Sequence, residues 1–273
     1  MRNKNRVKQK IPETPTQPNY QYAPPVDLVK LPSAGKFYPK DHPLHNVEEI
    51  EVGFMTTKEE DILISEAYAK QGTTMDKLIE SLLVKKVKVN TLLPGDKSAV
   101  VINARKNAYG PDYKIQVVCE SCFKQNEHVV DLENVGPKEV KYEDIQFTDK
   151  GTFIIKLPRT AASVELKFMT SEDEKKIEER AKQKSEHNLP ETPASDRLRQ
   201  LIVSVDGNES VLVIGDFVSK LPIADSLHVK RKYTQVVPDI DFTYEFPCSE
   251  CEHANKGNVP IAGDFFWPDE GLY

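Results

Sequence analysis

Two stretches carry the strongest structural signal in the chain: Tyr113-Lys-Ile-Gln-Val-Val-Cys119-Glu-Ser-Cys122 and Phe242-Thr-Tyr-Glu-Phe-Pro-Cys248-Ser-Glu-Cys251. In each, a run of alternating character, which is typical of a β-strand, leads directly into a Cys-x-x-Cys pair. The two pairs contain all four cysteines of the sequence. Each stretch therefore predicts a β-hairpin whose turn presents two thiols on one side.

The similarity between the stretches extends upstream, so we interpret the chain as a duplicated unit. The segment Glu51-Val-Gly-Phe-Met-Thr-Thr-Lys-Glu-Glu-Asp reappears as Glu165-Leu-Lys-Phe-Met-Thr-Ser-Glu-Asp-Glu-Lys. A repeat period above about 100 residues indicates two domain-sized copies rather than a solenoid of small repeats. The predicted fold class is α+β, with two tandem pseudo-repeat domains that each contain helices and a Cys-x-x-Cys (zinc-knuckle) β-hairpin. The expected divisions are a disordered or extended arm over 1–27, a first repeat over 28–140 and a second repeat with an aromatic C-terminus over 141–273.

Helix starts are predicted from capping-box spacing, in which a Ser or Thr is followed three residues later by an acidic side chain. The predicted boxes are Thr57 with Glu60 in the first copy and Ser171 with Glu174 in the second.

The later elements of each copy are predicted from periodicity. A helix is expected to begin near Asp96, and its counterpart near Asp225. Strands returning from the cysteine turns are expected at Val129-Val-Asp-Leu and Val259-Pro-Ile, and residues 180–195 are expected to form an exposed loop.

Two short-spaced pairs of thiols match the ligand set of a structural Zn²⁺ ion. The candidate ligands are Cys119, Cys122, Cys248 and Cys251. In the favoured arrangement the hairpins face each other and all four thiolates bind one ion, because each pair supplies only two sulfurs. Alternatively, each pair forms its own site with another subunit or with a histidine, and His128 and His253 lie nearest in sequence. Free thiols, or a disulfide within each pair, are the alternative without metal.

Composition argues against several functional classes. No apolar run approaches the ~20 residues that cross a bilayer, and none follows the basic N-terminus as in a signal peptide. The chain is therefore expected in the cytoplasm when it is made, where paired cysteines favour metal binding over disulfides. The sequence contains no Walker loop, Gly-x-Gly-x-x-Gly, His-Glu-x-x-His or Gly-x-Ser-x-Gly motif, so no enzymatic activity is expected and no catalytic residue is assigned.

The two ends are expected to contact other proteins. Residues 1–27 alternate basic residues and then become rich in proline, a composition that cannot form a core of its own. Phe265-Phe-Trp267 is a large apolar group that must pack on something, either a partner or the second repeat.

The order of several motifs resembles the baseplate hub proteins of contractile-tailed, T-even-type bacteriophages. The motifs are Leu31-Pro-Ser-Ala-Gly-Lys-Phe-Tyr-Pro39, the Phe-Met-Thr segment, Ala104-Arg-Lys-Asn-Ala-Tyr-Gly110, the Cys-x-x-Cys hairpin and Phe265-Phe-Trp-Pro268. The resemblance covers most of residues 28–268 and implies a structural or assembly role in the tail baseplate, without catalysis. It places the chain in the virion tail, and in the host cytoplasm during assembly. The implied partners are other baseplate hub and tail proteins, with the tape-measure protein as a further candidate, in a symmetric assembly.

The alternative function is that of a zinc-ribbon protein that binds nucleic acid or has a regulatory role. Such a ribbon usually interleaves Lys and Arg with exposed aromatic residues around its knuckles. Here the neighbours of the cysteines are mainly acidic: Glu120, Glu127, Glu245, Glu250 and Glu252, against Lys124 and Lys256. The net charge of -6 also gives no general attraction to nucleic acid, so this alternative is disfavoured.

Overall fold

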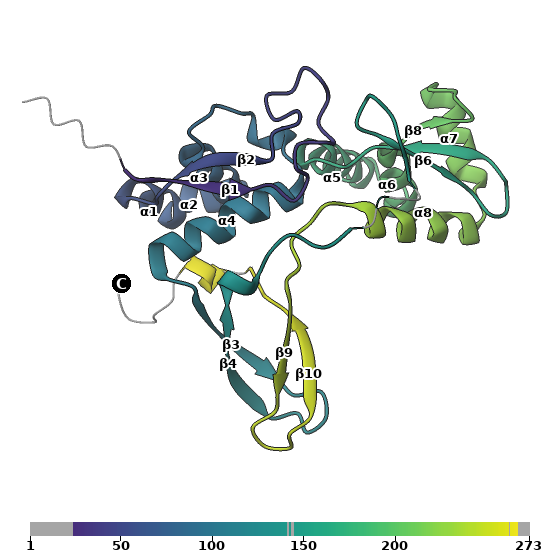
Figure 1. Cartoon of the computed structure of the whole chain (residues 1–273). Helices are drawn as coiled ribbons and strands as arrows, with labels where there is room; N and C mark the ends of the chain where they lie inside the picture. The colour runs from purple at the N-terminus through teal and green to yellow at the C-terminus, as the bar shows by residue number, and fades with distance from the viewer. Residues whose placement is uncertain (1–23, 141, 143–144, 262, 267–273) are drawn as a thin grey trace, which may run out of the picture.

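The computed structural model describes residues 24–140, 142, 145–261 and 263–266. In this part of the chain, helices and small sheets form two groups side by side, and two hairpins project away from them (Figure 1). The sheets are antiparallel, which confirms the predicted α+β class.

The α-helices are α1 (Thr57–Ile64), α2 (Glu66–Gln71), α3 (Thr74–Leu82), α4 (Pro94–Tyr109), α5 (Ser171–Glu186), α6 (Pro193–Leu201), α7 (Val211–Lys220) and α8 (Ile223–Val236). The strands are β1 (Val26–Lys30), β2 (Glu49–Gly53), β3 (Asp112–Val118), β4 (Gln125–Asp131), β5 (Gln146–Phe147), β6 (Phe153–Lys156), β7 (Ser163–Leu166), β8 (Ile202–Val205), β9 (Thr243–Pro247) and β10 (Ala254–Asn258). Short 3-10 helices are η1 (Val89–Thr91), η2 (Leu132–Asn134) and η3 (Gly263–Phe266).

The first group is the two-stranded sheet β1–β2 packed against helices α1 to α4. Alternation along β2 buries Ile50 and Val52 and leaves Glu49 and Glu51 exposed. Helix α4 contacts both strands, and Val100 at its centre is fully buried. Each such side chain contributes about 1.5–3 kcal/mol on burial, so the buried apolar residues of α4 help to hold this small sheet in place.

The second group is a four-stranded antiparallel sheet in the order β5-β6-β7-β8, accompanied by helices α5 to α8. Phe153, Val164 and Leu166 of the sheet are fully buried. A bulge between Glu165 and Leu166 shifts the register of β7 against β8. This sheet supplies the core of the second group, as the β1–β2 sheet does for the first.

The two groups are joined by aromatic and polar contacts. Phe37, from the turn after β1, lies 4.5 Å from Phe168 between ring centroids. Lys97 of α4 donates hydrogen bonds to Asp76 of α3 and to Ser171 of α5, both at 2.7 Å. The groups therefore share a packed interface rather than a bare linker.

The capping boxes exist, but the predicted residues, Thr57 with Glu60 and Ser171 with Glu174, are wrong by one position. Thr56 is the N-cap of α1, and Glu59 accepts a hydrogen bond from its backbone N–H at 2.9 Å. Thr170 and Asp173 form the corresponding box of α5. The N-cap must be extended, as Thr56 is with φ −124°, whereas the next residue already belongs to the helix.

Asp96, in the first turn of α4, makes buried contacts that the sequence did not reveal. Its carboxylate accepts hydrogen bonds from the Ser33 N–H at 3.0 Å, the Ser33 hydroxyl at 2.6 Å and the Tyr38 hydroxyl at 2.7 Å. Burial raises the pKa of this carboxyl group, although the three donors oppose the shift. Asp96 thereby fixes the turn after β1 to the start of α4.

Asp225, in the first turn of α8, has the same role in the second group. It accepts hydrogen bonds from the backbone N–H groups of Arg159 and Thr160, both at 2.9 Å, and from the Thr160 hydroxyl at 2.8 Å. The carboxylate is fully buried. Each group thus has a turn fixed to an aspartate at a helix N-terminus, where the helix dipole favours negative charge.

Three boundaries expected from the sequence are corrected by the structure. Strand β10 spans Ala254–Asn258 and ends before the predicted strand at Val259; its polar sequence has low β-propensity, but the tight cysteine turn fixes where it starts. Strand β4 likewise begins at Gln125, before the predicted Val129. Helix α5 continues to Glu186 into the expected loop over 180–195, because i,i+4 pairs such as Lys182 with Glu186 support a helix that has little apolar surface.

The expectation that the C-terminal aromatic residues contact another protein is wrong for two of them. Phe265 and Phe266 are 0% and 1% exposed. The Phe265 ring lies edge-on to Tyr113 of β3 at 5.0 Å, and Arg105 of α4 donates from Nε to the Phe265 carbonyl at 2.8 Å. They therefore pack beside the first group, not on the second repeat. Trp267 and residues 1–23 of the expected arm lie outside the described residues, and residues 26–27 belong to β1.

Candidate metal centre

The two hairpins β3–β4 and β9–β10 end in turns with the same backbone hydrogen bonds. In the first, the Cys119 N–H donates to the Lys124 carbonyl at 2.9 Å and the Phe123 N–H donates to the Cys119 carbonyl at 3.0 Å. In the second, Cys248 and His253 are paired in the same way at 3.0 Å. The repeated Cys-x-x-Cys spacing thus folds into the same tight loop twice, as predicted from the preceding strands.

These loops bring together all four cysteines predicted as ligands. The Cys119 and Cys251 sulfurs are 3.7 Å apart, the Cys122 and Cys248 sulfurs are 3.6 Å apart, and all four Sγ atoms lie within 4.8 Å of one another. No disulfide links them. Each close pair joins one hairpin to the other, as in the arrangement with one shared cluster.

The cluster has the dimensions of a tetrahedral thiolate site. Zn–S bonds of about 2.3 Å place neighbouring sulfurs of a tetrahedron about 3.8 Å apart. The two cross-hairpin separations of 3.7 and 3.6 Å match that edge. A divalent ion at the centre would therefore require little movement of the loops, although binding itself stays a prediction.

The pKa values of the thiols differ strongly. The backbone N–H of Cys122 is the main cause that lowers the pKa of Cys119 to about 6. The pKa of Cys122 is raised to about 12: the Lys124 backbone N–H lowers it, but burial and the neighbouring thiols of Cys251 and Cys248 outweigh that effect. Adjacent thiolates repel one another. A cation bound between them would offset this repulsion and so favour the ionised form of all four cysteines.

Two buried asparagines hold the two cysteine turns (the knuckles) against each other, and the sequence analysis did not identify them. The Asn126 side-chain oxygen accepts a hydrogen bond from the Ser249 N–H at 2.9 Å, and the Asn255 oxygen accepts one from the Glu120 N–H at 2.9 Å. Each asparagine stands on one hairpin and reaches the turn of the other. The available signal was the spacing Cys-x-x-Cys-x-x-x-Asn, which occurs in both hairpins.

Neither candidate histidine belongs to the cluster that the described residues form. The His128 ring stacks on Tyr244 at 5.3 Å and lies 5.4 Å from Phe246, so it packs between the two hairpins. His253 contributes its backbone carbonyl to the second turn. The alternative in which each pair recruits a histidine therefore has no support in this geometry.

Comparison with known proteins places the chain in a family. The family model described as T4 bacteriophage base plate protein matches residues 24–267, which is most of the chain. The chain belongs to this family. No curated protein and no solved structure matches this baseplate protein. The resemblance in motif order is thereby confirmed at the level of the family.

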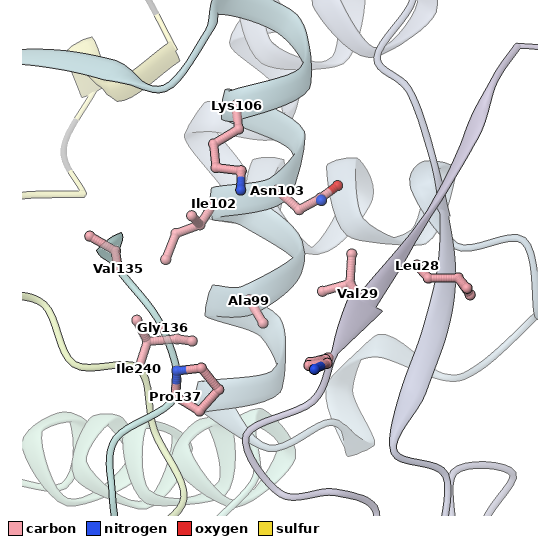
Figure 2. A pocket seen from close by; sticks show the side chains of 11 residues that line it. Leu28, Val29, Ala99, Ile102, Asn103, Lys106, Val135, Gly136, Pro137 and Ile240 are labelled. Carbon is pink, nitrogen blue, oxygen red and sulfur yellow. The ribbon is translucent and has the colours of Figure 1, made fainter. Parts of the chain in front are cut away.

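A separate cavity of about 250 Å³ lies between β1 and α4 of this baseplate protein (Figure 2). Its lining combines apolar residues, Val29, Ile102 and Ile240 among them, with the polar side chains of Asn103 and Lys106 (Figure 2). Lys30 also lines it. Lys106 pairs with Glu133 at 2.8 Å. The lining contains no carboxylate, histidine, cysteine or hydroxyl group, and its two amino groups are those of Lys30 and Lys106.

None of the described helices combines the length and the apolar composition that crossing a membrane requires.

Proposed function

We propose that this chain is a structural or assembly component of the hub of a phage tail baseplate, that it acts through protein–protein contacts without catalysis, and that it contains a structural zinc site. The family match over residues 24–267 carries the proposal. Its proposed partners are other hub and tail proteins, with the tape-measure protein as a further candidate, in a symmetric assembly. The chain would enter this assembly in the host cytoplasm and remain in the virion tail. The acidic residues around the knuckles argue against the nucleic-acid alternative, because they repel phosphate.

The proposed ligands of the zinc ion are Cys119, Cys122, Cys248 and Cys251. The donor set supports Zn²⁺, since four thiolates at tetrahedral spacing suit zinc or iron, and a structural role needs no redox chemistry. Such an ion would join two hairpins that are far apart in sequence.

We also propose that the two halves, with divisions near residues 28–140 and 141–273, are copies of one ancestral unit. The order of elements supports this proposal. In each half, a strand pair is followed by a helix with a Thr N-cap (Thr56 or Thr170), then by a helix whose first turn contains a buried aspartate (Asp96 or Asp225), and finally by a Cys-x-x-Cys hairpin.

Three strongly exposed apolar side chains on α7 and at the start of α8, which we call the α7 face, support a role in protein contacts. Val211, Leu212 and Ile223 are 82%, 84% and 79% exposed. The charges beside them are already paired, since Lys220 contacts Asp216 at 2.7 Å. The occupant we propose is an apolar, uncharged surface of another baseplate protein.

Replacing Leu212 by Asp tests this role. We expect the variant to fold normally, because the side chain is exposed, but to reduce complementation of a phage lacking this gene by at least about tenfold, as loss of an interface side chain does. Leu189→Asp is the matched control: the same substitution at a 56% exposed leucine between α5 and α6. Equal complementation by the two variants would count against the α7 face, and failure of the wild-type gene to restore baseplates would count against the proposed function.

Replacing Asn126 or Asn255 by Ala should weaken zinc binding. Outer groups that orient metal ligands typically contribute about 10–100-fold to metal affinity, and these two amides hold the knuckles in register. Competition with a chromophoric chelator measures the affinity. Asn134→Ala, at an exposed site distant from the cysteines in sequence, serves as the control. Unchanged affinity in both knuckle variants would mean that the sulfurs alone position the ion.

A further inference from the structure

We propose that Phe123, in the first knuckle, is a docking residue that inserts into an apolar pocket with a cationic rim on another baseplate protein. The inference rests on the proposed baseplate role and deepens it, because it names the chemistry of the surface that the knuckles meet.

The position of Phe123 suits contact with a partner. The side chain is 78% exposed, whereas phenylalanine is among the residues most often buried in proteins. The turn that contains it closes the β3–β4 hairpin, at the end of the projection that points away from both helical groups (Figure 1). Nothing in the described fold covers this ring, so its burial would have to come from another molecule.

The backbone shows that phenylalanine is a poor choice for the turn itself. Phe123 has φ +59°, in the left-handed region that glycine adopts freely and that is unfavourable for a bulky side chain. The corresponding residue of the second knuckle, Glu252, has φ +58°. The turn requires this conformation, because the Phe123 N–H must reach the Cys119 carbonyl. A large aromatic side chain at a strained and exposed site indicates a use outside the fold.

Charge specifies the rim of the partner pocket. Glu120, Glu250 and Glu252 are exposed around the two turns and form no ion pair with a described residue, while Lys124 is the one lysine or arginine within these turns. Four thiolates outweigh the charge of one divalent ion, so the proposed metal centre is itself anionic. A surface that accepts this tip must therefore present Lys or Arg around its apolar pocket. A second copy of the same tip would be repelled, which excludes self-association through it.

The test replaces Phe123 by Gly and, as a matched control, Glu252 by Gly. Both changes relieve the same left-handed conformation, so both purified variants should keep their zinc and melt at or above the temperature of the wild type. We expect F123G to reduce complementation of a phage lacking this gene, and incorporation into isolated baseplates, by at least about tenfold. E252G removes one of the three carboxylates but no apolar group, so we expect it to reduce both by much less. A structural role for the ring would instead lower the melting temperature of F123G.

The results of this test distinguish the docking role of Phe123, the cationic rim and the proposed baseplate function from one another. Normal incorporation of F123G, or equal loss in F123G and E252G, would overturn the docking role. A charge reversal, Glu250→Lys, should also reduce incorporation, and no reduction would overturn the cationic rim. If the wild-type gene itself fails to restore baseplates, the proposed function fails first, and this result is visible in the same assay.

Discussion

Replacing Cys119 by Ser should abolish zinc binding and lower the melting temperature of the whole chain by more than about 10 °C, since a lost structural zinc corresponds to several kcal/mol. The reason is geometric: the Cys119 sulfur lies 3.7 Å from the Cys251 sulfur on the other hairpin, so one substitution breaks a site to which both hairpins contribute. Structural zinc contributes on the order of 10 kcal/mol of apparent binding free energy in small peptides.

Elemental analysis of the purified protein should find about one zinc per chain, with little iron, and a strong chelator should reproduce the effect of the substitution. Ser121→Ala is the control, because Ser121 lies in the same turn but is exposed and is not a candidate ligand. A C119S variant that retains zinc and melts like the wild type would eliminate the four-cysteine site.

Replacing Asp96 by Ala should reduce the free energy of unfolding by about 3–5 kcal/mol, because buried donors left without an acceptor cost about 1–3 kcal/mol each. The donors are the Ser33 N–H, the Ser33 hydroxyl and the Tyr38 hydroxyl. The carboxylate that satisfies them is 1% exposed, so water cannot readily take its place. Chemical denaturation measures the loss.

Asp216→Ala is the control for this prediction. Asp216 also sits on a helix and pairs with Lys220, but both side chains are well exposed, and such pairs contribute less than about 1 kcal/mol. A loss in D96A no greater than that of the control would show that the turn after β1 does not depend on Asp96.

The sequence predicted the knuckles well because cysteine is rare and its spacing has a narrow chemical meaning. Four cysteines in two identical pairs, each after an alternating run, left few alternatives, and the structure places all four sulfurs together. The asparagines that lock the knuckles were missed because amides are common and their partners lie on the other hairpin: Asn126 and Ser249 are 123 residues apart.

The other errors arose because a short stretch of sequence does not determine the backbone conformation or the contacts with distant residues. Adjacent hydroxyl residues, Thr56-Thr57 and Thr170-Ser171, satisfy the capping pattern in either register, and only the backbone conformation selects the first. The contacts of Asp96 span 63 residues and cannot be seen in a window along the chain. The burial of Phe265 depends on Arg105, which is 160 residues away.

The contacts between the two hairpins also determine when, during synthesis of the chain, the four-cysteine cluster can close. The sulfurs of Cys122 and Cys248 meet although they are 126 residues apart, so the cluster closes a loop that contains the entire second helical group. A chain still emerging from the ribosome has only half of the proposed ligands until the β9–β10 hairpin is synthesised. Loop-closure entropy rises only slowly with loop length, so this late closure is thermodynamically inexpensive. Metal capture at the proposed site would therefore distinguish chains that contain both hairpins from shorter ones.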